Sequence, residues 1–309
     1  MNENRFAGGT SLFLRGLAVI HAVAFLSFWT QCAGLVGPHG LLPAARFFGV
    51  VHAQLGASAL LQFPSLCWFF GAGAFLPLLC AIGIALAALL FLGIAPAACV
   101  ALLWACYLSV VGAGQIFYEF QWDGLLLETT LLAIFVAPWT LRPGWRRVEP
   151  PRLARWLMWW LLFRLMLLSG LVKLASGDPA WRALTALTFH FETQPLPTPL
   201  AWYANRLPAA FDRLACAVMF GIELAAPFAL AAGRRLRHVA ALALIGLQVL
   251  IALTGNYTFF NLLTVALCLL CLDDAWWQNR GMGFQPLLSR IARFRRGRPK
   301  VARASSPAV

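Results

Sequence analysis

The chain has 309 residues, of which 61% are hydrophobic and only 11% are charged. Soluble domains carry about 25% charged residues, so this composition excludes an ordinary water-soluble globule. The apolar residues lie in long blocks with almost no charge, and about 20 such residues suffice to cross a bilayer as a helix. The sequence therefore predicts an all-α polytopic bundle of transmembrane helices, with the lipid bilayer as its first partner.

The apolar blocks indicate about eight spans in chain order. Pro77 lies inside the second block, where a proline removes a helical hydrogen bond and is expected to kink the span. A very short T-G-N-Y turn separates the last two blocks. The predicted spans are residues 12–34, 66–92, 94–113, 124–140, 156–175, 212–232, 238–254 and 257–272.

The net charge of +13 arises from arginines that gather in a few places. Basic residues mark cytoplasmic loops in membrane proteins, so we interpret the excess as topological and expect no nucleic-acid partner. An even number of predicted spans separates the clusters, so all of them fall on one side and both termini are predicted to be cytoplasmic. The clusters are Arg5, residues 142–155, residues 234–237 and residues 290–303.

We therefore divide the chain into a transmembrane domain, residues 1–274, and a basic cytoplasmic tail, residues 275–309, that is largely disordered. His190 and Glu192 are two residues apart, which matches no metal-ligand spacing. Cys268 and Cys271 form a C-x-x-C inside an apolar helix, where cysteines act as small hydrophobic side chains. The sequence predicts no metal site and no cofactor.

The opposite, non-cytoplasmic face receives the connections between spans, beginning with residues 35–65. Lys173 lies near this face and either extends outward to water or pairs with a carboxylate. The carboxylates considered for that pair are Asp123, Glu128 and Asp178. Because loops on a rigid scaffold often carry function, we predict the functional face here. Its candidate residues are Glu119, Gln121, Trp122, Asp123, Glu128, Lys173, Asp178, His190, Glu192, Asn256 and Tyr257.

A second polar layer is predicted within the membrane. Arg164 and Glu223 lie at nearly equal depth when residues are counted from the cytoplasmic ends of their spans. A charge at the bilayer centre is costly unless it is paired, so we predict an Arg164–Glu223 ion pair, with His21 and Gln248 at similar depth. Such a pair either clamps two helices together or belongs to a path for a substrate or a proton.

Four longer motifs carry a family resemblance. They are F-Q-W-D-G-L-L-L-E-T from Phe120, R-L-M-L-L-S-G-L-V-K-L-A-S-G-D-P-A-W from Arg164, F-H-F-E-T-Q-P-L-P-T-P-L-A-W-Y from Phe189 and T-G-N-Y-T-F-F-N from Thr254. In this order they resemble the lipase maturation factor family. The resemblance implies a polytopic membrane protein that assists folding of a secreted client, in the bacterial inner membrane or, for a eukaryotic chain, in the endoplasmic reticulum.

Two expectations follow from resemblance. Many family members carry a soluble domain after the membrane region, and we expect that domain to be absent from this chain. The segment G-L-V-K-L from Gly170 is similar to the membrane region of vitamin K-dependent carboxylases and related horizontally transferred transmembrane domains, in which the matching lysine acts as a base. Our leading hypothesis is a non-enzymatic factor that binds a client or an apolar ligand; the alternative is a membrane enzyme that uses Lys173 as a base on a quinone-like or lipid substrate.

Overall fold

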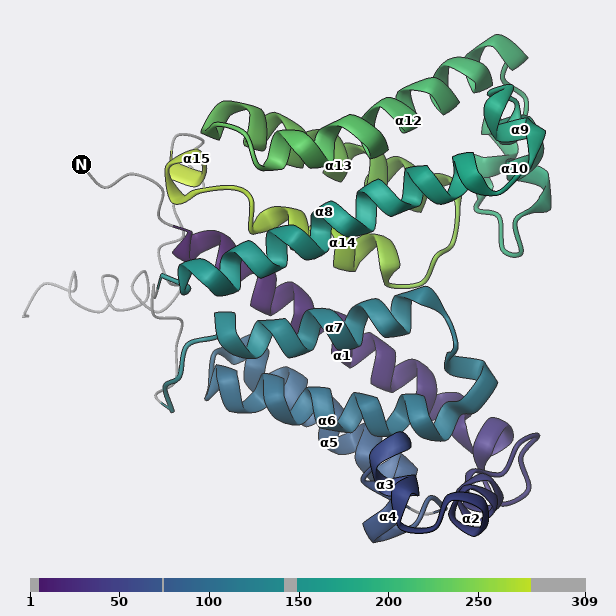
Figure 1. The fold of residues 1–309 in the computed structure, drawn as a ribbon, viewed down its shortest axis with the longest axis vertical. Coiled ribbons are helices and arrows are strands. Elements are labelled where there is room, and N and C mark those ends of the chain that lie inside the picture. The colour runs from purple at the N-terminus through teal and green to yellow at the C-terminus, as the bar shows by residue number, and fades with distance from the viewer. Residues whose placement is uncertain (1–5, 74, 142–148, 279–309) are drawn as a thin grey trace, which may run out of the picture.

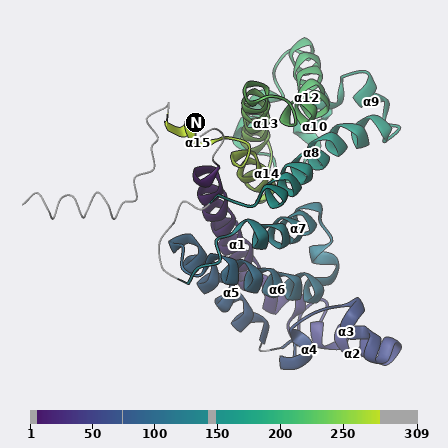
Figure 2. The ribbon, with the colours of Figure 1, turned by 60° about the vertical axis from the view of Figure 1, so that its left-hand side comes forward.

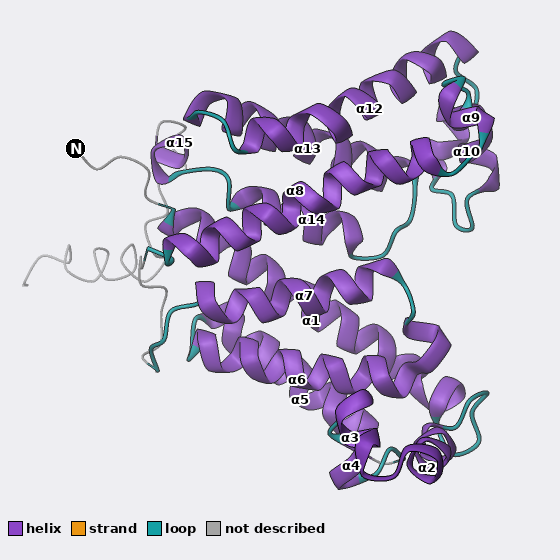
Figure 3. Ribbon diagram, in the orientation of Figure 1, coloured by secondary structure: helices purple, strands orange, loops and turns teal. Residues whose placement is uncertain are grey.

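The computed structural model describes residues 6–73, 75–141 and 149–278. Within these ranges every regular element is a helix and no strand occurs, which confirms the predicted all-α class (Figure 3). The predictions that concern Arg5, residues 142–148 or the tail after residue 278 fall on residues outside these described ranges.

The long helices form two groups (Figure 1). The first group comprises α1 (Ala7–Val36), α5 (Phe75–Leu92), α6 (Pro96–Gly114) and α7 (Gln121–Val136). The second comprises α8 (Arg152–Ala175), α12 (Ala209–Leu230), α13 (Arg234–Thr254) and α14 (Phe260–Leu269). Helix α1 packs against both α5 and α14, so it joins the two groups, and α7 packs against α8.

Among the described residues, seven helical stretches are long and apolar enough to cross a membrane, which supports a polytopic membrane protein. The set differs from the eight predicted spans. Helix α7 has 16 residues and α14 only 10, so both fall short of that length. The stretch Ala44–Gln62 qualifies by length and composition, although the sequence placed it in a connection. It consists of α2 (Ala44–Leu55), η1 (Gly56–Ser58) and α3 (Ala59–Gln62).

The second predicted span, residues 66–92, is not continuous. The short helix α4 (Cys67–Phe70) ends at Gly71, which has a φ of +74°. Helix α5 begins afresh at Phe75, so Pro77 lies in its first turn, where a proline removes no helical hydrogen bond. The predicted kink within this span is therefore wrong. Together with α2 and α3, α4 lies at one end of the first group of helices (Figures 1 and 2).

We call the two ends of the bundle the basic end and the outer end. At the basic end α8 and α13 begin, with Arg152 and Arg234 as their first residues. At the outer end α7 begins and the turn between α13 and α14 lies (Figure 1). The F-Q-W-D and T-G-N-Y motifs thus share one end, as the count of spans required. Which end faces the cytoplasm stays a prediction.

Two neighbouring carboxylates tie distant parts of the chain together at the basic end. Asp273 is only 1% exposed and accepts hydrogen bonds from Arg234 Nε and Nη2 at 2.5 and 2.9 Å. Burial by itself raises the pKa of this carboxyl, but the bonds from Arg234 and the Trp276 amide outweigh it and hold the pKa below its ordinary value. The Gly8 amide donates to Asp274 Oδ1 at 2.7 Å, which fixes the start of α1 to α15 (Asp274–Gln278).

Candidate functional site

The first polar cluster lies within the first group of helices. Asp123, in the first turn of α7, is 3% exposed and accepts a 2.6 Å hydrogen bond from the Tyr107 hydroxyl of α6. The Tyr107 ring meets His21 edge to face at 5.6 Å, and His21 Nε2 lies 2.9 Å from Thr130 Oγ1. Aromatic rings surround these groups, so the cluster forms a polar centre in an otherwise apolar core.

We expect Tyr107→Phe to lower the free energy of unfolding by about 1 to 2 kcal/mol, because it leaves the buried Asp123 carboxyl without its hydroxyl donor. Thermal unfolding in detergent measures the change. Tyr118→Phe is the matched control, since its ring contacts Tyr107 at 6.3 Å but its hydroxyl makes no hydrogen bond to a described residue. Equal losses in the two variants would contradict the role of the hydrogen bond.

The second cluster joins α8 to α12. Lys173 Nζ donates to both carboxylate oxygens of Glu223, at 2.6 and 2.7 Å. The Glu223 side chain is 3% exposed and that of Lys173 is 24% exposed. Gly170 lies one turn before Lys173, and a Cβ there would meet Leu224 at 2.7 Å, so the absence of a side chain allows α8 and α12 to approach.

The third cluster joins α8 to α7 through an ion pair between Arg164 and Glu128. The partners predicted from sequence are therefore wrong. Arg164 pairs with Glu128 rather than with Glu223, and Lys173 pairs with Glu223 rather than with Glu128 or the other carboxylates considered. Of these, Asp123 bonds to Tyr107, and Asp178 accepts the Ala180 amide at 2.8 Å as the N-cap of α9 (Pro179–Arg182).

The long connection after α8 folds back on the turn between α13 and α14. His190 of α10 (Ala186–Thr193) stacks parallel to Tyr257, with its Nε2 atom 3.2 Å from the Tyr257 hydroxyl. Burial, with a smaller contribution from the positive charge of Lys173, lowers the pKa of His190, so the ring is neutral at pH 7. Further along, Gln194 Nε2 donates to the Thr254 carbonyl at 2.8 Å, and Thr198 Oγ1 to the Leu253 carbonyl at 2.5 Å.

A cavity of about 380 Å³ lies where these two segments meet. Gly255 fits between them because a Cβ there would meet Gln194 Oε1 and the Tyr257 ring, each at 2.8 Å. Asn261 is 3% exposed and donates to the Gln248 carbonyl at 3.0 Å, while its Oδ1 atom accepts no hydrogen bond from a described residue. The cavity is lined by Leu196, Pro197, Thr198, Ala252, Gly255, Asn256, Tyr257, Thr258 and Asn261.

The predicted functional face is thus divided in the structure. Asn256 and Tyr257 line the cavity, and His190 contacts Tyr257, but Lys173 does not line it. Glu192 is exposed and accepts a 2.8 Å bond from Asn205. At the start of α7, Glu119 and Gln121 are exposed, and Trp122 stacks on Phe120 at 4.5 Å. Four residues of these clusters were not among the predicted site residues: Gln194, Thr198, Asn261 and Tyr107. The first three lie inside two of the motifs quoted above.

The family model described as "Lipase maturation factor transmembrane domain" matches residues 9–279. The chain belongs to the lipase maturation factor family. It is 46% identical over 282 residues to lipase maturation factor 2 of Homo sapiens, a match that covers 85% of this chain and 40% of the relative. It is 42% identical to lipase maturation factor 2 of Xenopus tropicalis, with 89% and 40% covered. No solved structure matches the chain.

Lipase maturation factor 1 of Mus musculus is 37% identical over 273 residues, covering 85% of this chain and 47% of the relative. The chain therefore spans less than half the length of these relatives. Family membership and the long apolar helices together make it an integral membrane protein. The function of the full-length relatives is therefore a proposal for this chain.

Proposed function

We propose that this chain assists the maturation of a secreted lipase by contacting the client, or an apolar ligand, at its outer end. The names of its relatives support a lipase as the client. In this proposal the outer end faces the compartment in which the client folds, either the bacterial periplasm or the lumen of the endoplasmic reticulum. The Arg-rich basic end then faces the cytoplasm.

One observation carries the choice of the outer end: a cavity there has an exposed apolar side chain in its wall, and the connection that supplies this residue exposes further large apolar side chains. Leu196 lines the cavity and is 64% exposed. Phe189 of α10 is 60% exposed and Tyr203 of α11 (Pro199–Ala204) is 64% exposed. A cavity beside a segment with several exposed apolar side chains is typical of a site that binds another molecule. The same connection contains the F-H-F-E-T-Q-P-L-P-T-P motif.

Site-specific photo-crosslinking tests this proposal without requiring catalysis. A photoreactive amino acid replaces Leu196 at the outer end, and the protein is expressed together with a secreted lipase in cells that lack other lipase maturation factors. We expect an adduct whose mass is the sum of the two proteins. The matched control is Leu236 of α13 at the basic end, which is similarly exposed at 58% and is expected to give no lipase adduct.

Equal lipase adducts from Leu196 and Leu236 would contradict contact at the outer end. Adducts with lipid alone at Leu196, while the lipase matures normally, would show that the exposed apolar groups contact the membrane surface instead. Secreted lipase activity, measured in the same cells with and without the protein, reports whether the chain assists maturation.

The alternative function, a membrane enzyme with Lys173 as its base, lacks this kind of support. Both hydrogen bonds of the Lys173 amine go to Glu223, so the amine is engaged in an ion pair rather than presented to a ligand. The amine also lies outside the set of groups that line the cavity. The geometry therefore favours the binding function over the catalytic one.

A further inference from the structure

The ion pair between Arg164 and Glu128 lies halfway along its helices. Arg164 is 12 residues from the start of α8 and 11 from its end, and Glu128 is 7 residues from the start of α7 and 8 from its end. Both groups therefore lie near the bilayer midplane. Charged side chains at this depth normally point into the protein interior or a polar cavity.

These two side chains are not enclosed by the described part of the chain. The Arg164 side chain is 40% exposed and that of Glu128 is 44% exposed. A guanidinium has five N–H donors, but only Nη2 of Arg164 is bonded to a described residue, and that bond goes to Glu128 Oε1. The other donors and the second carboxylate oxygen of Glu128 have no partner among the described residues. Lipid tails cannot form hydrogen bonds with these groups, so this surface requires contact with polar groups of another molecule.

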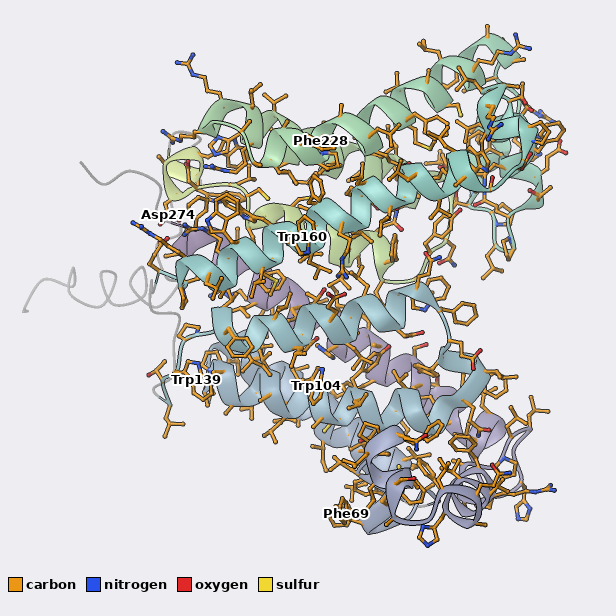
Figure 4. All side chains as sticks on the ribbon, in the orientation of Figure 1. Phe69, Trp104, Trp139, Trp160, Phe228 and Asp274 are labelled. Carbon is orange, nitrogen blue, oxygen red and sulfur yellow. The ribbon has the colours of Figure 1, made fainter. Side chains whose placement is uncertain are left out.

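The ion pair lies in a surface formed by neighbouring sides of two helices, α7 and α8, which we call the α7–α8 face. On α7, Leu131 and Phe135 follow Glu128 by three and seven residues and are 40% and 56% exposed. On α8, Trp160 and Leu168 lie four residues to either side of Arg164 and are 58% and 48% exposed. Such spacings put side chains on one side of a helix. Figure 4 shows Trp160 on α8, the helix beside α7.

The charges of the α7–α8 face indicate which molecule binds it. The face carries one cation with free donors and, beside it, one anion with a free acceptor, so it is complementary to itself. A two-fold symmetric contact brings the same patch of both subunits together. We propose that two copies of this chain associate in the membrane through the α7–α8 face, with Arg164 of each copy reaching Glu128 of the other. The aromatic and aliphatic groups that flank the ion pair then pack across the same contact.

Cysteine crosslinking in native membranes tests the proposal. All eight native cysteines are buried and unpaired, so Leu131→Cys introduces an exposed thiol on the α7–α8 face. We expect mild oxidation to shift the protein from its monomer mass of 33.9 kDa to twice that mass on a non-reducing gel. Val239→Cys on α13 is the matched control, since it is 64% exposed and, like Leu131, lies five residues from the basic-end terminus of its helix.

A charge exchange provides the second arm. Arg164→Glu makes the face acidic in one tagged copy, and Glu128→Arg makes it basic in another. We expect the two variants to co-purify when expressed together, whereas neither co-purifies with a second copy of itself. Wild-type copies are expected to co-purify with each other.

The proposal is overturned if Leu131→Cys stays monomeric, or if it dimerises no more than Val239→Cys. It is also overturned if the thiol at position 131 crosslinks to a different protein, because the face then has another cover. The cysteine variants keep the ion pair intact, so they decide the matter even if the charge variants fail to fold. None of these outcomes depends on a lipase client.

Discussion

Replacing Lys173 with methionine is expected to lower the free energy of unfolding by about 3 kcal/mol. Removing one partner of a buried ion pair leaves an uncompensated charge, which costs about 3 to 5 kcal/mol. We place the expectation at the lower end because Lys173 is itself 24% exposed, while the stranded Glu223 carboxylate is 3% exposed. Chemical or thermal unfolding in detergent measures the loss.

The control adds Glu223→Gln to Lys173→Met. Removing the stranded carboxylate is expected to restore most of the lost stability, because the amide carries no charge to bury. If the double variant loses as much as the sum of the single variants, the two side chains are not coupled. The double variant also separates structure from chemistry: if it is stable and still supports lipase maturation, Lys173 is not a catalytic base.

Replacing Gly9 with alanine is expected to lower the free energy of unfolding by about 2 to 3 kcal/mol, as overpacking of a rigid contact does. A Cβ at Gly9 would lie 2.6 Å from the Leu269 carbonyl oxygen and 3.0 Å from that of Leu272. Both are backbone atoms, the first in the last residue of α14 and the second three residues beyond it. No side chain can therefore rotate away, and the two segments must separate. A lower melting temperature in detergent measures this effect.

Gly16→Ala is the matched control on the same helix. A Cβ there would meet only the Ala266 Cβ of α14 at 3.5 Å, which is an ordinary contact. Alanine also favours a helix over glycine, so we expect a change within about 1 kcal/mol and toward greater stability. Equal destabilisation by both substitutions would show that the α1–α14 contact is less rigid than the structure indicates.

The sequence predicted the helical class, most of the long helices and the end of the bundle at which the motifs gather. Long apolar blocks and the spacing of arginines carry this information directly. The start of α9 follows a local rule of the same kind, since Asp178 is its N-cap and Pro179 its first residue. Lengths were less predictable, since an apolar block does not show that α14 ends after 10 residues.

The partners of the charges within the long helices were not predictable from depth alone. Arg164 and Lys173 are nine residues apart on α8, which at about 100° per residue places them on opposite sides of the helix. One therefore faces α7 and the other faces α12. In addition, Lys173 lies 21 residues from the basic-end start of α8, whereas its partner Glu223 lies only 7 residues from the basic-end terminus of α12. The basic ends of the two helices are therefore not level, so counting residues from those ends misplaced Glu223 relative to Arg164.

The cavity could not be predicted from the sequence either, for a different reason. Its walls come from residues 196–198 and 252–261, which are far apart along the chain. They meet where Gln194 and Thr198 bond to carbonyls at the end of α13. The motifs marked both segments as unusual. Nothing in either segment alone indicates that they enclose a space together.

The packing of α1 against α14 has a consequence for biogenesis. Helix α1 leaves the ribosome long before α14, so the side of α1 that meets α14 stays uncovered while the intervening helices are made. Final assembly is therefore expected to be a late event that follows insertion of the individual helices. Nascent chains truncated before α14 should remain sensitive to proteases that act within the membrane, and full-length chains should become resistant.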